Sequence, residues 1–243
     1  EKPEPLVPRT LRFTVPERVD AKGGVRLALD EKAVEELADT LAAKGVESIA
    51  VGFLHSYANP AHERRTAEIL AEKLPSVRIS LSCDVCPEVR EYERFSTTCA
   101  NAYVQPLMGR YLESLRRRIA QAGFACPILL MTSGGGLTTL ETAVRFPIRL
   151  VESGPAGGVI LSTSIAERFG IDRILSFDMG GTTAKICIID DGKPMASRSF
   201  EVDRRYRFMK GSGLPVRIPV IEMVEIGAGG GSLASVDAMK RIT

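Results

Sequence analysis

The chain has 243 residues, enough for one large domain or two modest ones to bury a core. Its 32 basic and 30 acidic residues are spread along the sequence and lack the footprint of a nucleic-acid-binding protein. The apolar runs are too short to span a bilayer, no signal-peptide pattern opens the chain, and the five cysteines are scattered. We expect a cytoplasmic protein with reduced thiols that acts on a small molecule, without nucleic acid or membrane.

Both ends of the sequence resemble cuts through a longer polypeptide. The chain begins Glu1-Lys2-Pro3 without a methionine and ends at Thr243, just after an apolar, glycine-rich stretch. The prolines within residues 1–10 fix φ and remove backbone donors, so we expect an extended connector there.

Hydrophobic periodicity and turn residues predict alternating strands and helices in the first half of the chain. Asn59 and Pro60 suit the start of a helix. The elements expected are a strand over Leu11–Val15, a helix from Asp30 to Gly45, a buried strand over Ser48–His55, a helix from Asn59 to about Lys73, and a strand over Val77–Leu81.

A long helical stretch is expected to open at Pro87, to be interrupted around Pro106 and to end near Gly123. The alternation that follows favours an α/β sheet wrapped by helices. Its elements are a strand over Pro127–Met131, a helix over 138–145, a strand over Ile148–Val151, a helix over 156–168 and a strand over Ile174–Phe177.

From Thr183 onward the pattern changes to consecutive strands joined by turns. A hairpin is expected to follow directly, since Asp191-Gly192 is a typical two-residue hairpin turn. The strands expected are Ala184–Asp190, Met195–Val202 and Val216–Ile226, with a second turn at Gly211-Ser212-Gly213.

The motif with the clearest chemistry is Asp178-Met179-Gly180-Gly181-Thr182-Thr183. Two glycines let the backbone turn so that its amides approach a polyphosphate, and the two threonines add hydroxyl donors. A carboxylate beside such a turn can hold hydrated Mg²⁺ against the phosphates. The alternative is an ordinary type I′ hairpin, which has no need of the aspartate or the threonines. The spacing is not that of a Walker loop.

A second segment, Glu152–Gly158, lies upstream and opens a helix rich in small residues, although an ordinary helix start explains each residue equally well. The order of segment, helix, strand, Asp-x-Gly-Gly-Thr and hairpin resembles the region around the second phosphate loop of actin, sugar kinases and heat-shock chaperones. This resemblance implies an α/β, actin-like ATPase (ribonuclease H-like) fold with mixed sheets flanked by helices, incomplete at both ends.

Further segments make the resemblance more specific. They are Phe53–Pro60, Arg90–Arg94 with Ser96–Thr98 and Asn101–Tyr103, Ser133–Gly136, Glu152–Gly158, Asp178–Lys185 and Ile226–Ser232. In this order they resemble the successive signatures of the hydantoinase A and 5-oxoprolinase family. By this resemblance residues 1–85 are the C-terminal part of the family's N-terminal region. Residues 86–243 are then the N-terminal part of the hydantoinase A/oxoprolinase domain.

The family resemblance implies ATP-dependent opening of a cyclic amide such as a hydantoin or 5-oxoproline, through phosphorylation of its carbonyl oxygen. It also implies the cofactors ATP and Mg²⁺ and a hydantoinase B-like partner subunit or domain. Two alternatives stay open: a subunit of an acetone- or acetophenone-type carboxylase, which shares the phosphorylation step, and a non-catalytic ATP-binding module.

Site residues follow from the motif and the resemblance together. Asp178 is the candidate catalytic and magnesium-binding residue, and the candidate nucleotide-binding residues are Gly180, Gly181, Thr182, Thr183, Lys185, Gly229, Gly230 and Gly231. Family members carry an earlier Asp-x-Gly-Gly-Thr loop, of which this chain has only the later copy, so we expect the isolated chain to be inactive. Glu222 stands where the family pattern suggests an aspartate.

Four weaker signals have structural explanations as well. The Cys83-x-x-Cys86 spacing suits zinc, but no second cysteine pair follows, so a zinc site is disfavoured. His55 and His62 are expected to be structural. The charges of Arg90–Arg94 are expected on a solvated helix face, with an interdomain or substrate role as the alternative. The Gly227–Ser232 run half-resembles a dinucleotide fingerprint, although a turn near nucleotide or substrate fits better.

Overall fold

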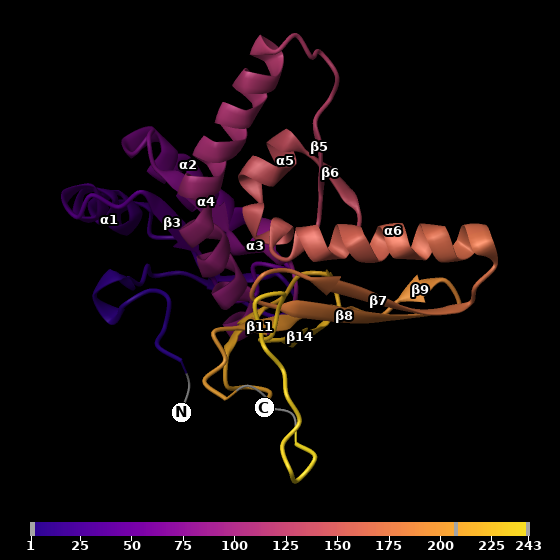
Figure 1. The fold of residues 1–243 in the computed structure, drawn as a ribbon. Helices are drawn as coiled ribbons and strands as arrows, with labels where there is room; N and C mark the ends of the chain where they lie inside the picture. Colours follow the sequence, from indigo (N-terminus) through magenta and orange to yellow (C-terminus); the bar gives the residue numbers. More distant parts are fainter. Residues whose placement is uncertain (1–2, 207–208, 242–243) are drawn as a thin grey trace. The chain divides into compact units, whose positions relative to one another are not determined.

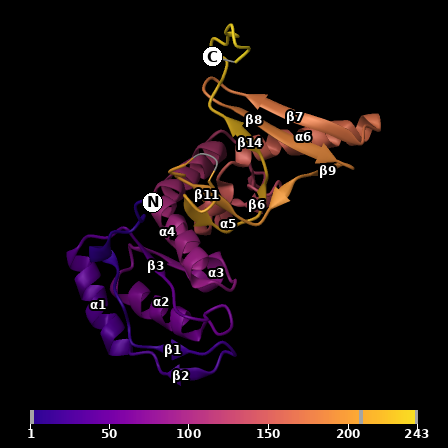
Figure 2. The same ribbon diagram turned by 90° about the horizontal axis from the view of Figure 1, so that it is seen from below.

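The computed structural model describes residues 3–206 and 209–241 and has a mixed α/β fold, as expected (Figures 1 and 2). Its contacts divide the chain into two compact units. The first comprises residues 1–130, 137–151 and 198–218, and the second comprises residues 131–136, 152–197 and 219–243. Among the described residues, no helix is both long and apolar enough to cross a membrane.

The first unit begins with short strands and two helices. Its elements up to residue 85 are η1 (Arg9–Leu11), β1 (Arg18–Val19), β2 (Val25–Leu27), α1 (Glu31–Ala43), β3 (Ser48–Val51), α2 (Ala61–Lys73), β4 (Arg78–Leu81) and α3 (Ser82–Val85). The later elements are α4 (Glu91–Gln121), β5 (Leu129–Met131, at the boundary of the unit), β6 (Leu137–Thr139), α5 (Leu140–Arg145), η2 (Pro147–Leu150), β11 (Phe200–Val202) and β12 (Leu214–Val216).

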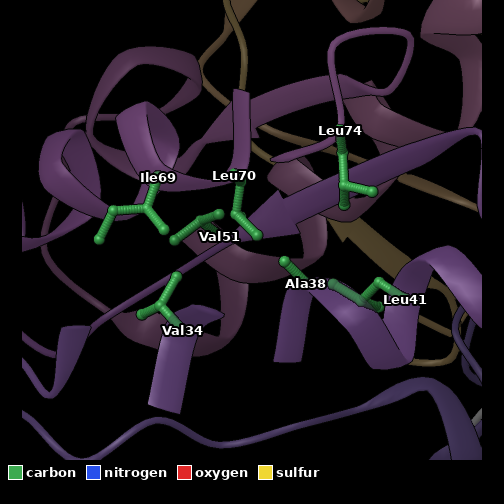
Figure 3. Packing of buried hydrophobic residues seen from close by; sticks show 7 residues of the cluster. All are labelled: Val34, Ala38, Leu41, Val51, Ile69, Leu70 and Leu74. Carbon is green, nitrogen blue, oxygen red and sulfur yellow. The ribbon is translucent and has the colours of Figure 1, made fainter. Parts of the chain in front are cut away.

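The main core of this unit lies between α1, α2 and the parallel pair β3–β4. Helix α1 begins where the sequence predicts, because the Asp30 carboxylate accepts a hydrogen bond from the Ala33 amide at 3.0 Å. The buried residues shown in Figure 3 come from both helices and β3: Val34, Ala38, Leu41, Val51, Ile69, Leu70 and Leu74. In α1 they recur at helical spacing, which is why this face is buried.

Three strand predictions in the first unit are wrong in position or type. Residues 9–11 form a 3₁₀ turn closed by the Leu11 amide on the Pro8 carbonyl, and no strand covers Leu11–Val15. Strand β3 ends at Val51, because residues 54–58 form a turn with φ of 57° at His55. The strand expected over Ile148–Val151 is the 3₁₀ helix η2, which Pro147 favours at its first position.

Helix α4 is continuous through Pro106, which contradicts the expected interruption. A proline removes one backbone hydrogen bond and crowds the preceding turn, at a cost of roughly 3 kcal/mol in a helix interior. Contacts of α4 with β3, β4, β12, η2 and α5 compensate for this local cost. Tertiary packing therefore decides the length of this helix.

A fully buried arginine links α4 to the loops around it. Arg94 donates from Nε to Ser82 Oγ at 3.1 Å, from Nη1 to the Glu88 carbonyl at 2.9 Å and from Nη2 to the Phe53 carbonyl at 2.8 Å. Ser82 Oγ in turn donates to the buried carboxylate of Glu63 at 2.7 Å. Arg94 Nη2 also lies 3.5 Å from the Glu91 carboxylate. The expectation of a solvated face is therefore wrong for Arg94, whose side chain is buried and hydrogen-bonded inside the unit.

The second unit is an α6-covered antiparallel sheet. Its elements are α6 (Ser153–Phe169), β7 (Arg173–Met179), β8 (Ala184–Asp190), β9 (Lys193–Pro194), β10 (Ala196–Ser197), β13 (Val220–Ile221) and β14 (Val224–Ile226). Strands are ordered β14-β8-β7, with β9 also paired to β8, and α6 runs along β7 and β8 (Figure 1). Its core contains Ala156, Val159, Cys187, Ile189 and Ile221.

Strand β8 has the predicted bounds, and the predicted turn after it is confirmed. Asp191 and Gly192 both have positive φ, at 48° and 66°, as a type I′ turn requires. The two long strands expected later are broken into shorter ones: Met195–Val202 becomes β10 and β11, and Val216–Ile226 becomes β12, β13 and β14. Pro219 explains one break, because it cannot donate to a ladder.

We predict that Arg94→Leu destabilises the chain by about 3–5 kcal/mol, because the buried Ser82 oxygen and the carbonyls of Glu88 and Phe53 lose their donor. Denaturant unfolding followed by circular dichroism measures this change. Arg117→Leu is the matched control, since Arg117 is exposed on the same helix. An equal and small effect of both substitutions would mean that the buried network contributes no stability.

Candidate functional site

The connection between β7 and β8 is a tight turn over residues 180–183. The Gly180 amide donates to the Thr183 carbonyl at 2.9 Å, and Met179 pairs with Ala184 in the ladder. None of these four residues has positive φ, so the turn is not the type I′ hairpin that was the alternative explanation of the two glycines. Another reason for the glycines is therefore needed.

The space around both glycines is open: a Cβ on Gly180 would lie 3.7 Å from the Thr183 carbonyl oxygen, and one on Gly181 would meet nothing within 4 Å. The glycine run that follows β14 lies against this turn. Strand β14 pairs antiparallel with β8, and its last residue, Ile226, lies opposite Ala184 at the turn. The Gly230 amide then donates to the Gly180 carbonyl at 2.9 Å, and the Gly231 amide donates to the Gly181 carbonyl at 3.4 Å. The structure thus brings together the two glycine segments that the sequence analysis singled out.

Gly229 lies against the turn so closely that no side chain fits. A Cβ atom on Gly229 would lie 2.6 Å from the carbonyl carbon and oxygen of Gly181 and from the Thr182 amide nitrogen. The run is also fixed internally, because the Ser232 amide donates to the Gly229 carbonyl at 2.8 Å. The turn therefore rests on backbone rather than on side chains, and its exposed side stays clear for a ligand.

Asp178 stands one residue before the end of β7 and is exposed. Among residues 3–206 and 209–241, its carboxylate has no hydrogen bond or ion pair with another side chain. The hydroxyls of Thr182 and Thr183 likewise have no partner within the described part of the chain. The site therefore presents one carboxylate, two hydroxyls and a glycine turn without side chains that cover it.

Lys185 lies opposite Asp178 in the β7–β8 ladder, so both side chains leave the same face of the sheet. Its ammonium forms an ion pair with the carboxylate of Glu152, and Glu225 Oε1 lies 3.8 Å from the same nitrogen. The Lys185 side chain is 15% exposed and that of Glu152 is 38% exposed, so the ammonium is mostly shielded from solvent and the carboxylate only in part. The ammonium is held beside the site, although not at Asp178.

Glu152 and Glu225 belong to this site and were not among the predicted site residues. Glu225 could have been found from the register, since it lies opposite Lys185 in the β14–β8 ladder. Glu152 sits at the N-cap of α6 with a left-handed backbone, φ 62° and ψ 16°, and makes no side-chain cap. Only the packing of α6 on the sheet brings it to Lys185, which lies 33 residues later.

The donor set at the turn fits magnesium bound together with a nucleotide. No group of three or more His, Cys, Asp or Glu side chains capable of holding a metal occurs among the described residues. Magnesium commonly uses one or two carboxylates and completes its octahedron with phosphate oxygens and water. Asp178 supplies one exposed carboxylate, so the residues present fit a metal that arrives with phosphate and not a separate protein-bound metal.

The Ser133–Gly136 segment packs inside the second unit. The Ile221 amide donates to the Ser133 carbonyl at 2.9 Å, and a Cβ on Gly135 would lie 2.7 Å from Ile160 Cδ1. Gly135 also has φ of 82°, a backbone conformation that residues with a side chain rarely adopt.

Glu222, where the family pattern suggests an aspartate, donates its backbone amide to the Met195 carbonyl at 2.8 Å.

The histidines and the Cys83/Cys86 pair lie in the first unit. His62 Nδ1 lies 2.9 Å from a carboxylate oxygen of Glu17, as a structural role requires. Burial, followed by the charge of Glu63, raises the pKa of the Cys83 thiol, and burial raises that of Cys86. Without a metal both thiols are therefore protonated at neutral pH.

Comparison with known proteins adds the family. The profile of the hydantoinase/oxoprolinase family matches residues 94–243, and that of the hydantoinase/oxoprolinase N-terminal region matches residues 2–74. An uncharacterized protein of Methanocaldococcus jannaschii is 39% identical over 240 residues, which are 98% of this chain and 35% of that protein. The caprolactamase subunit alpha of Pseudomonas jessenii is 34% identical over 96% of this chain and 32% of its own length.

Two solved structures are similar over almost the whole chain. The ATP-dependent caprolactamase of Pseudomonas jessenii has a TM-score of 0.80 at 31% identity, over 97% of this chain and 33% of that one. Nucleotide-free acetone carboxylase has a TM-score of 0.79 at 29% identity, over 99% of this chain and 33% of that one. The chain thus spans about a third of the length of these relatives. By sequence and by fold, it belongs to the hydantoinase/oxoprolinase family.

Proposed function

We propose that this chain forms the ATP-binding part of an enzyme that hydrolyses a cyclic amide, such as a hydantoin, 5-oxoproline or another lactam. The observation that carries the proposal is the exposed Asp178 carboxylate beside a turn that is braced only by backbone. Such a turn offers amides and hydroxyls to a phosphate, and the carboxylate offers a place for its metal. The family to which the chain belongs supports this assignment.

The chain's own residues would bind and orient the phosphates. Amides of the turn and the hydroxyls of Thr182 and Thr183 donate to phosphate oxygens, and Asp178 holds Mg²⁺, which neutralises phosphate charge when bound. The γ-phosphoryl group passes to the carbonyl oxygen of the amide as ADP leaves. Water then attacks the activated carbon, and the ring C–N bond breaks as the nitrogen takes up a proton, which leaves an acyl phosphate. A second water hydrolyses this acyl phosphate to the carboxylate and inorganic phosphate. ATP thus converts a poor electrophile into a reactive one.

A ketone carboxylase is the second candidate, and the similarity to acetone carboxylase over 99% of this chain favours it. In that case the phosphoryl group would be transferred to the oxygen of a ketone enolate, and carbon dioxide would be the electrophile for the resulting carbon nucleophile. The phosphate-binding residues have the same task in both reactions. Their geometry alone therefore supports phosphate binding and does not distinguish the two acceptors.

We also propose that the protein works with a partner subunit of the hydantoinase B type. The similar protein of Pseudomonas jessenii is described as the alpha subunit of a caprolactamase, which supports a multi-subunit enzyme. A partner would supply groups that bind the organic substrate, because the roles that we propose for Asp178 and the turn over residues 180–183 concern only phosphate and metal.

We predict that Asp178→Ala removes the stabilisation of the chain by magnesium and ATP while its stability in buffer changes by less than about 0.5 kcal/mol. The exposed carboxylate has no partner to lose, so only ligand binding should suffer. Thermal unfolding with and without magnesium–ATP measures both effects. Asp172→Ala, at an exposed position before β7, is the control and should behave as the wild type. A large loss of stability in buffer would make Asp178 a structural turn residue.

We predict that Gly229→Ala weakens ATP binding and destabilises the second unit by about 1–3 kcal/mol, because a methyl group must displace the Gly181–Thr182 backbone. Isothermal titration with ATP and hydrogen exchange at residues 180–183 measure the two effects. Gly227→Ala is the matched control, because a Cβ there meets nothing within 4 Å. Unchanged exchange at the turn in Gly229→Ala would show that the glycine run does not brace it.

The substrate class can be tested in one ADP-release assay on the polypeptide as the cell makes it, together with its partner subunit. If the cyclic amide is the substrate, 5-oxoproline, hydantoin or caprolactam should stimulate ADP release. Acetone or acetophenone with bicarbonate should not, since closure around the wrong substrate leaves the phosphoryl acceptor misplaced. Stimulation by ketone and bicarbonate alone would promote the carboxylase. Equal release under every condition would favour a non-catalytic ATP-binding module.

A further inference from the structure

Asp178 and Lys185 are opposite charges on directly paired residues of β7 and β8. Side chains in such a pair leave the sheet about 5 Å apart on one face, so an ion pair between them is the simplest outcome. The structure has a different arrangement. The Lys185 ammonium pairs with Glu152 from the start of α6, and within the described residues the Asp178 carboxylate is left without a counter-ion.

Whether Lys185 pairs with Asp178 or with Glu152 matters for metal binding at Asp178. An ammonium seated on Asp178 would neutralise the carboxylate and occupy the position of a cation, so magnesium would have to displace it. An ion pair that takes Lys185 elsewhere removes this competition. Because the Lys185 side chain is 15% exposed, its attraction to a carboxylate is screened less than that of a surface lysine.

Glu152 is held in an unfavourable backbone conformation that puts it in this place. Its φ of 62° costs a non-glycine residue on the order of 1–2 kcal/mol, and its side chain returns no cap hydrogen bond to α6. A glycine or asparagine would suit the helix start better. Strain at such a position is typical of residues whose side chain has a task. The contact that this side chain makes is the ion pair with Lys185.

We propose that Glu152 is a positioning residue that holds Lys185 away from Asp178 and so keeps the Asp178 carboxylate available to the magnesium–nucleotide complex. This inference rests on the proposed ATP-binding function. Glu225 assists from β14, at 3.8 Å from the ammonium. The lysine stays beside the phosphate turn as a cation, although its resting partner is a glutamate outside that turn.

The test is the dependence of ATP affinity on magnesium, measured by isothermal titration of the full chain in excess magnesium and in EDTA. The ratio of the two dissociation constants reports how well the site uses the metal, independently of turnover. In Glu152→Gln this ratio should fall about tenfold from its wild-type value, because the released Lys185 moves to Asp178. In the double variant Glu152→Gln/Lys185→Met the ratio should recover, since no ammonium remains to compete.

Controls separate this inference from the function on which it rests. If the wild type itself binds ATP without any effect of magnesium, the proposed function fails. If magnesium strengthens ATP binding equally in the wild type and in Glu152→Gln, the positioning role of Glu152 is wrong. It is also wrong if the ratio of dissociation constants stays low in the double variant Glu152→Gln/Lys185→Met. Glu167→Gln, on the last turn of α6, should match the wild type. Should circular dichroism show Glu152→Gln misfolded, Glu152→Gly accepts the positive φ and gives the same readout.

Discussion

The candidate site in the second unit is built on one contact between two backbones, that of Gly229 with Gly181 and Thr182. The contact requires a glycine at position 229 and a register of β14 on β8 that ends with Ile226 at Ala184. Hydrogen bonds from Gly230 and Gly231 then hold the turn from behind without any side chain. The phosphate binding that we propose for this turn needs outward amides that are rigid and uncovered, and support from a second glycine loop satisfies both conditions.

Charge is distributed around this turn so that each group has a separate task. The Lys185 ammonium lies between the carboxylates of Glu152 and Glu225 on neighbouring elements, whereas Asp178 is exposed on the same face of the sheet. If Lys185 formed an ion pair with Asp178, the two charges would neutralise each other. The carboxylate would then attract a metal less, and the ammonium would attract a phosphate less. The ion pair between α6 and β8 also fixes the start of the helix relative to the sheet. Packing and electrostatics are therefore coupled through Glu152.

Some features of the fold and of the candidate site could be predicted from residues close together in the sequence, and others could not. The hairpin after Asp178, the bounds of β8 and the Asp30 helix cap follow from turn and cap preferences that act within a few residues. Helix α4 through Pro106 and the burial of Arg94 depend on distant elements that outweigh a local rule. Glu152 could not be assigned because its partner is reached only after α6 folds back on the sheet. Such contacts need a topology before they can be predicted.

The two structural relatives also indicate where substrate choice does not lie. Caprolactamase and acetone carboxylase carry out different reactions, yet both match nearly all of this chain, with TM-scores of 0.80 and 0.79. A backbone shared so evenly by two chemistries cannot by itself distinguish a lactam from a ketone. The difference must reside in side chains on this backbone or in the two-thirds of each relative that the match leaves out. Phosphorylation of a carbonyl oxygen is common to both proposals, so the roles that we propose for the turn and Asp178 are the same whichever acceptor is used.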